Sequence, residues 1–208
     1  MNKKWFIYAG LAGVSFALLS LVLNRKSKPA GKTALIVGDS LSYDLNWGWA
    51  GKLARAYGFT IVKNLSKVGA STPYMVQALK TYLASNAAPD MVFIFGGTND
   101  NFSGISNQTA TQNIQSMVNM AAEKGVKDIY VISGYSAKKV TAPFNVARYA
   151  NLIDSADSFR FGLKNKISGA KVVPVWTGAD STMSNDAIHL NPNAHTLFAT
   201  YIGNYLFL

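Results

Sequence analysis

Short apolar segments alternate with longer segments of helical periodicity from Thr33 to the C-terminus. Most of the short segments are continuously apolar, which is typical of parallel strands that are buried on both faces. These segments predict five strands, over residues 33–37, 60–63, 91–95, 128–132 and 171–175.

Between the predicted strands, apolar residues recur every three or four positions, which indicates amphipathic helices. One helix is expected to open with Thr72 as its N-cap and Pro73 as its first residue, and another is expected to end at Gly125. The alternation of strands and helices, with right-handed crossovers, predicts an α/β fold in three layers, α/β/α, around a parallel sheet. The helix that ends at Gly125 is expected over 106–124, and the remaining helices are expected over 45–57 and 145–165 and from residue 191 onward.

The N-terminal segment differs from the rest of the chain. Trp5 to Leu23 is a run of 19 residues without a charge. A helix of this length is about 28 Å long, which matches the hydrocarbon core of a bilayer. We expect an uncleaved single-pass transmembrane helix over residues 5–23; a cleaved secretory signal and a buried helix are the alternatives. Residues 1–32 then form a membrane anchor and basic tether, and residues 33–208 form the globular domain.

Charge and composition narrow the possible partners. The 208 residues carry a net charge of +10, and residues 1–32 contain six lysine or arginine residues and no acidic residue. The rest of the chain is only mildly basic and has no basic stripe interleaved with aromatic residues, so we expect no nucleic-acid partner. The chain has no cysteine, which excludes disulfides and thiolate metal sites.

Three of the predicted strands end in polar, glycine-containing segments. The first runs into Gly-Asp-Ser-Leu at 38–41, which places Ser40 at the carboxyl edge of the sheet. The second leads into residues 64–70, where Gly69 lets backbone N–H groups approach a ligand. The third ends in residues 96–100, which contain Asn99 and its amide donor. Each segment alone could be an ordinary turn, but ligands of such sheets bind at this edge.

A fourth polar segment precedes the last predicted helix. Asp186 lies three residues before His189, a spacing that lets the carboxylate orient the imidazole. His195, the only other histidine, is expected to be a partly exposed helix residue. Together the four segments supply a hydroxyl, backbone donors, an amide and an oriented imidazole, which is a complete set for acyl transfer.

These segments resemble the SGNH (GDSL-like) hydrolase family, named for its serine, glycine, asparagine and histidine. They occur in the order of that family and span about 150 residues. The resemblance implies a flavodoxin-like sheet of strand order 2-1-3-4-5. It also implies Ser40 as nucleophile, His189 as its base, Asp186 as the group that orients His189, and an oxyanion hole made by Ser40, Gly69 and Asn99. No metal or organic cofactor is implied.

The resemblance does not name a substrate, since the family includes lipases, thioesterases and carbohydrate acetylesterases. No long insertion separates the motifs to build a lid or a deep acyl tunnel. This favours a small acyl group on a large alcohol, such as an O-acetylated glycan of the cell envelope. We also expect the catalytic domain on the extracytoplasmic side of the membrane. Trp47 and Trp49 could stack on a sugar or belong to the core. The alternatives are a lysophospholipase or thioesterase acting on lipids, and a non-catalytic membrane-tethered binding or structural module.

Overall fold

The computed structural model describes residues 29–141, 150–184, 186 and 188–208. The predicted membrane anchor, residues 5–23, and the beginning of the predicted tether lie outside these residues. Within the described part of the chain, no helix is both long enough and apolar enough to span a bilayer.

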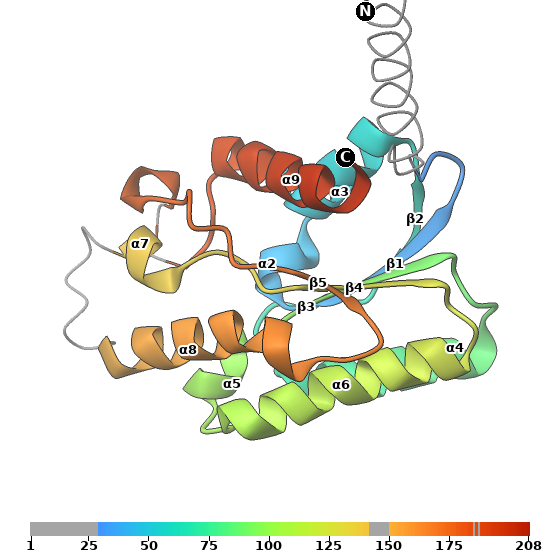
Figure 1. Ribbon diagram of the computed structural model, residues 1–208, viewed down its shortest axis with the longest axis horizontal. Coiled ribbons are helices and arrows are strands. Elements are labelled where there is room, and N and C mark those ends of the chain that lie inside the picture. The colour runs from blue at the N-terminus through green and yellow to red at the C-terminus, as the bar shows by residue number, and fades with distance from the viewer. Residues whose placement is uncertain (1–28, 142–149, 185, 187) are drawn as a thin grey trace, which may run out of the picture.

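A parallel five-stranded sheet forms the middle layer of the domain (Figure 1). Its strand order is β2-β1-β3-β4-β5, and each neighbouring pair of strands runs parallel. This confirms the order implied by the family resemblance. The strands are β1 (Thr33–Gly38), β2 (Thr60–Asn64), β3 (Met91–Phe95), β4 (Asp128–Ile132) and β5 (Lys171–Val173).

Helices cover both faces of the sheet, so the predicted three-layer sandwich is confirmed (Figure 1). The first face carries α3 (Trp49–Tyr57) and α9 (Pro192–Phe207). The opposite face carries α4 (Thr72–Ser85), α6 (Asn107–Glu123) and α8 (Ala150–Lys166). Shorter helices follow strand ends or precede α9: α2 (Ser40–Tyr43), α5 (Thr98–Phe102), α7 (Ala137–Thr141) and a 3₁₀ turn at Ser181–Met183.

The central strand β3 shows why its sequence is continuously apolar. Met91, Phe93 and Phe95 pack into the core beneath α3 and α9, whereas Val92 and Ile94 pack into the core beneath α4, α6 and α8. All five side chains are at most 2% exposed. Because successive side chains of a strand point to opposite faces, a strand covered on both sides has no solvent-facing position to fill with polar residues.

The two tryptophans considered for sugar stacking have different surroundings. Trp49 is fully buried, and its ring meets Phe93, Phe95 and Phe198 at centroid distances of 6.1, 6.1 and 6.3 Å in edge-on geometry. Trp49 is therefore a core residue that joins the first long helix, the sheet and the last helix. Trp47 is 62% exposed and remains available for binding.

Several predicted helix and strand boundaries were wrong. The helix expected over 45–57 begins only at Trp49, because the Asp44 carboxylate accepts the backbone N–H groups of Asn46 and Trp47 and closes a turn there. The strand expected over 171–175 ends at Val173, and the next residue, Pro174, has no N–H for a sheet hydrogen bond. The predicted beginning of the fourth helix, residues 145–149, lies outside the described residues, and its described part starts at Ala150.

The N-cap expected at Thr72 is also wrong, since Ser71 is the cap residue of α4. Both Thr72 donors, its backbone N–H and its hydroxyl, point to the buried carboxylate of Asp100. A carboxylate of α5 therefore satisfies the first turn of α4, and the two helices become fixed to one another.

Candidate active site

Ser40 is the first residue of α2, directly after β1, and Asp39 is the N-cap of that short helix. The Asp39 Oδ1 atom accepts the Leu41 N–H at 2.9 Å. A Cβ at Gly38 would lie 2.7 Å from the Phe95 carbonyl oxygen, so the strand can leave the sheet here only with glycine at this position. This turn presents the Ser40 hydroxyl at the carboxyl edge of the sheet.

The structure brings Ser40, His189 and Asp186 into one hydrogen-bonded chain. The His189 Nε2 atom lies 2.9 Å from Ser40 Oγ, and His189 Nδ1 lies 2.6 Å from Asp186 Oδ2. Asp186 Oδ1 accepts the backbone N–H groups of His189 and Ile188 at 2.7 and 3.0 Å. Partial burial raises the pKa of Asp186, but these hydrogen bonds and the imidazole outweigh it and hold the pKa below its usual value. An ionised Asp186 can stabilise a positive charge on His189.

The loop that carries Asp186 and His189 is closed at its base. Ser184 and Leu190 pair as an antiparallel bridge. Asn191 donates its backbone N–H to the Met183 carbonyl at 2.8 Å and its amide to the Thr182 carbonyl at 2.9 Å. Its amide oxygen also caps α9. The loop therefore cannot move without unwinding the start of α9.

Two of the predicted oxyanion residues, Gly69 and Asn99, come from the loop before α4 and from the short helix α5. Gly69 has φ +74°, a left-handed conformation that glycine adopts without strain, in the loop between β2 and α4. Asn99 is the second residue of α5, and its amide nitrogen donates to the Ala70 carbonyl at 3.0 Å. This bond uses one of the two amide hydrogens and ties Asn99 to the loop that contains Gly69.

Asn64 fastens the same loop to the nucleophile helix. Its amide donates to the carbonyl oxygens of Ser42 and Tyr43 at 3.0 and 2.9 Å, and its amide oxygen accepts the Ser66 N–H at 3.0 Å. The loops after β1, β2 and β3 are thereby joined by side-chain amides, which fixes the positions of Ser40, Gly69 and Asn99 relative to one another.

Two buried residues beneath the site were missed in the sequence. Arg160 of α8 is 5% exposed and donates to the Tyr135 carbonyl at 2.6 Å and to the Thr98 hydroxyl at 3.0 Å. Tyr135, 2% exposed, donates its own hydroxyl to the carbonyl oxygen of Ile188, next to His189. Burial raises the pKa of Tyr135 far above its usual range, so this hydroxyl stays protonated.

A helical pattern could have revealed Arg160. It lies four residues after Ala156 and three before Leu163, and both of these are buried. A charged residue on the apolar face of an amphipathic helix signals a buried polar contact. Nothing in the local sequence marks Tyr135, whose partner lies 53 residues away.

Asp39 is the other charged group under the nucleophile and is completely buried. Burial raises its pKa to about 6, although the Leu41 N–H and the positive charges of Arg160 and His189 act in the opposite direction. Its Oδ2 atom has no hydrogen-bond partner among the described residues.

His195 lies outside the triad, in the second turn of α9, and is partly buried, in line with the sequence analysis. Burial, followed by the positive charge of Lys52, lowers its pKa to about 4, so this imidazole is neutral at pH 7. Within the described residues, no group of three or more histidine or acidic side chains could hold a metal ion.

The sequence profile of the GDSL-like Lipase/Acylhydrolase family matches residues 36–197, which is most of the chain. The chain belongs to this family. This GDSL-like hydrolase, with Ser40, His189 and Asp186 in one hydrogen-bonded chain, is a serine ester hydrolase. Comparison with curated proteins gave no match.

Solved structures show that the GDSL-like hydrolase shares its fold with several other proteins. A lipolytic G-D-S-L protein from Veillonella parvula is 17% identical with a TM-score of 0.66, and the match covers 84% of this chain and 97% of that one. TesA is 24% identical with a TM-score of 0.65, over 84% and 98% of the two chains. Axe2, an acetylxylan esterase from Geobacillus stearothermophilus, is 16% identical with a TM-score of 0.60, over 86% and 95%.

Proposed function

We propose that this hydrolase removes short acyl groups, above all acetyl, from the hydroxyl groups of a glycan. The exposure of the triad carries this proposal. The side chains of His189 and Asp186 are 44% and 53% exposed. A site this open accepts a bulky alcohol beside Ser40 but buries little of a long acyl chain, whose binding depends on the apolar area removed from water.

Two exposed aromatic side chains lie at the end of the nucleophile helix α2 and in the turn that follows it. Tyr43 is 57% exposed and Trp47 is 62% exposed. The backbone of Trp47 is held by its hydrogen bond to the Asp44 carboxylate at 3.0 Å. Large amphipathic rings with one face in solvent suit a sugar, which has apolar C–H faces and polar edges. These rings support a glycan as the alcohol part of the ester.

The geometry supports the following reaction. His189 Nε2 takes the Ser40 proton while Ser40 Oγ attacks the ester carbonyl, and Asp186 stabilises the resulting imidazolium. The backbone N–H groups of Ser40 and Gly69 and the Asn99 amide bind the oxyanion. His189 returns its proton to the leaving alcohol, and the C–O bond to that alcohol breaks. Water, deprotonated by His189, then attacks the acyl-enzyme and releases the carboxylic acid and Ser40.

Two further observations favour an envelope glycan. Among similar folds, Axe2 is an acetylxylan esterase, so this architecture serves deacetylation of a glycan in that protein. In the present sequence, the uncharged segment from Trp5 to Leu23 has the length of a membrane anchor. An anchored, extracytoplasmic hydrolase would meet glycans of the cell envelope.

A chain-length series tests the proposal. The full chain should hydrolyse acetyl esters with a higher kcat/KM than octanoyl or longer esters, and it should release acetate from O-acetylated glycans. A clear rise of kcat/KM with acyl length would overturn the assignment in favour of a lipid substrate.

Covalent labelling separates catalysis from substrate choice. Ser40→Ala should abolish labelling by an organophosphorus reagent and lower ester hydrolysis by several orders of magnitude. Ser103→Ala removes an exposed serine hydroxyl outside the site and is the matched control. It should retain both covalent labelling and ester hydrolysis. Labelling that persists in Ser40→Ala would assign the nucleophile to another residue.

A further inference from the structure

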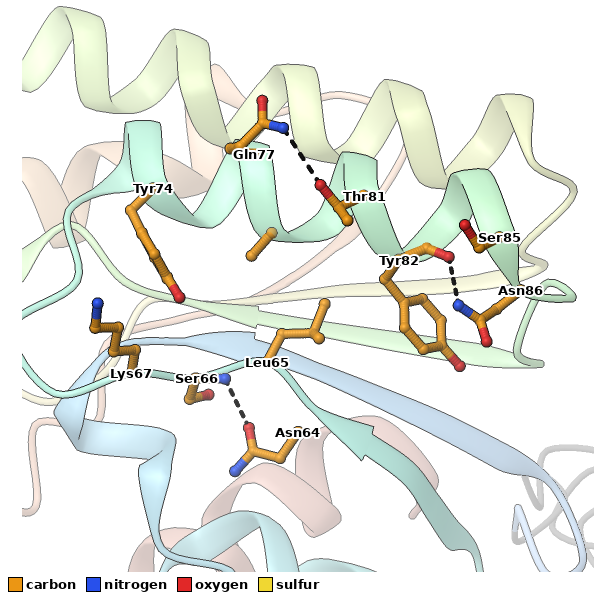
Figure 2. A pocket seen from close by; sticks show the side chains of 11 residues that line it. Asn64, Leu65, Ser66, Lys67, Tyr74, Gln77, Thr81, Tyr82, Ser85 and Asn86 are labelled. Carbon is orange, nitrogen blue, oxygen red and sulfur yellow. Dashed lines mark hydrogen bonds between the residues drawn. The ribbon is translucent and has the colours of Figure 1, made fainter.

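A groove runs between α4 and the segment that continues β2, on the side of the molecule next to the oxyanion loop (Figure 2). Its volume is about 720 Å³, within the range of sites that bind small molecules. One wall is α4 from Tyr74 to Ser85 with its C-cap residue Asn86, and the other is the segment 64–67. From Tyr74 to Ser85 the helix advances about 17 Å, so the groove is elongated.

The lining combines aromatic rings with side-chain amides and hydroxyls. Figure 2 shows Tyr74 and Tyr82 pointing from α4 toward the segment 64–67. Gln77 lies between them along the helix, and Asn86 lies at the far end. The one charged side chain among the lining residues is Lys67, whose ammonium lies 4.7 Å from the centre of the Tyr74 ring.

One end of the groove adjoins the turn that contains Gly69. Lys67 lines the groove, and its backbone N–H donates to the carbonyl oxygen of Gly38, two residues before the nucleophile. Its own carbonyl accepts the N–H of Ala70, which encloses Gly69 in a tight turn. A molecule whose ester lies at Ser40 can therefore extend over this turn into the groove.

We infer that the groove binds the glycan chain that carries the acyl group, at sugar units next to the one being deacylated. This inference rests on the proposed function and deepens it. Sugar rings place C–H faces on Tyr74 and Tyr82 and hydroxyls near the Gln77 and Asn86 amides, so both kinds of lining group are used. The Gln77 amide donates to the Thr81 hydroxyl at 3.3 Å and the Asn86 amide donates to the Tyr82 carbonyl at 2.8 Å. Each amide has a second hydrogen that a sugar hydroxyl can accept, whereas an acyl chain has no acceptor for it.

Filling the groove tests this inference without removing a packed side chain. Ala78 lines the groove on α4, and Ala84 is exposed on the same helix outside it. Ala78→Arg puts a long side chain into the groove, and Ala84→Arg makes the same change elsewhere; arginine suits a helix at both positions. Both variants are made in the full chain, purified in a mild detergent.

The substrates are O-acetylated oligosaccharides of increasing length from xylan and from peptidoglycan. Each kcat/KM is divided by the value of the same variant on p-nitrophenyl acetate, which has no chain to fill the groove. For the wild type and Ala84→Arg, this ratio should rise with the length of the oligosaccharide. For Ala78→Arg the ratio should not rise with length. On the longest substrate it should be about fivefold below the wild-type ratio, as expected from the loss of an aromatic contact. An equal gain in both variants would overturn the inference.

Two other outcomes separate the groove from the proposed function. If Ala78→Arg lowered kcat/KM on octanoyl esters alone, the groove would be an acyl site and the inference would be overturned. If the wild type cleaves p-nitrophenyl acetate but no acetylated oligosaccharide, the proposed function fails. Calorimetry with unacetylated oligosaccharides then tests whether the groove binds a glycan chain. Binding that Ala78→Arg weakens and Ala84→Arg preserves supports the inference, whereas no binding to the wild type overturns it.

Discussion

At the scale of single residues, Asn99 has two amide hydrogens with different surroundings. One is committed to the Ala70 carbonyl at 3.0 Å, and in the proposed mechanism the other binds the oxyanion. Asn99→Ala should lower kcat about 100-fold, which corresponds to about 3 kcal/mol, with little change in KM. Asn99→Asp should lower kcat further, because a carboxylate cannot donate a hydrogen bond and repels the oxyanion. Steady-state kinetics on p-nitrophenyl acetate measure both variants, and an effect confined to KM would contradict the oxyanion role.

The buried carboxyl of Asp39 makes stability depend on pH. Its pKa is raised from 3.8 to about 6 in the folded chain, so the folded state binds a proton that the unfolded state lacks between these values. This contribution to stability is present below the unfolded value and is lost as the pH rises through about 6. Asp39→Asn keeps an acceptor for the Leu41 N–H but cannot titrate.

Denaturant unfolding of both proteins at several pH values measures this effect. Relative to Asp39→Asn, the wild type should gain about 3 kcal/mol as the pH falls from about 7 to 4. A difference between the two proteins that stays constant with pH would show that Asp39 has an ordinary pKa. This comparison isolates Asp39, since every other titrating group is shared.

At the scale of elements, Arg160 and Tyr135 connect α8 and the end of β4 to both sides of the active site. Arg160 holds Thr98, next to Asn99, and Tyr135 holds Ile188, next to His189. We expect Tyr135→Phe to lower kcat about tenfold and to leave KM nearly unchanged. The variant leaves the partly buried Ile188 carbonyl without its donor and loosens the base, which costs about 1 kcal/mol.

Tyr130→Phe removes the same hydroxyl group from the middle of β4 and serves as the matched control. The pH profile of kcat distinguishes positioning from simple destabilisation. A loosened His189 should shift the profile of Tyr135→Phe even under conditions where that variant is fully folded. An unchanged profile with lower thermal stability would make Tyr135 a structural residue only.

The elements could be predicted from the sequence where the hydrophobic effect alone decides them. The bounds of β3 and β4 agree with the prediction because both strands are buried on both faces. Residues 98–102 form a short helix, α5, that has no apolar periodicity to reveal it. The turn before α3 depends on hydrogen bonds of Asp44 rather than on burial. In the same way, the four polar motifs predicted the triad, whereas Tyr135 depends on a partner far along the chain.

At the scale of the whole molecule, the sheet, both helical layers and the triad lie within the part of the chain that begins at residue 29. Two separate cores fill the spaces above and below the sheet, and their described residues lie between Ala34 and Phe207. Deletion of residues 1–28 should therefore leave a folded hydrolase with the kcat/KM of the full chain on p-nitrophenyl acetate. Loss of cooperative thermal unfolding in the truncated protein would place the N-terminal segment in the core instead.

The hydrogen bond between Ser40 and His189 joins residues 149 positions apart, and α9, which follows His189, closes the core over Trp49. Synthesis on the ribosome delivers the nucleophile early and delivers the base only later, just before α9. A nascent chain can thus pair its first strands but has no imidazole to activate its serine. Ester hydrolysis can begin only after His189 and α9 have been made, so the order of the chain itself keeps shorter nascent chains inactive.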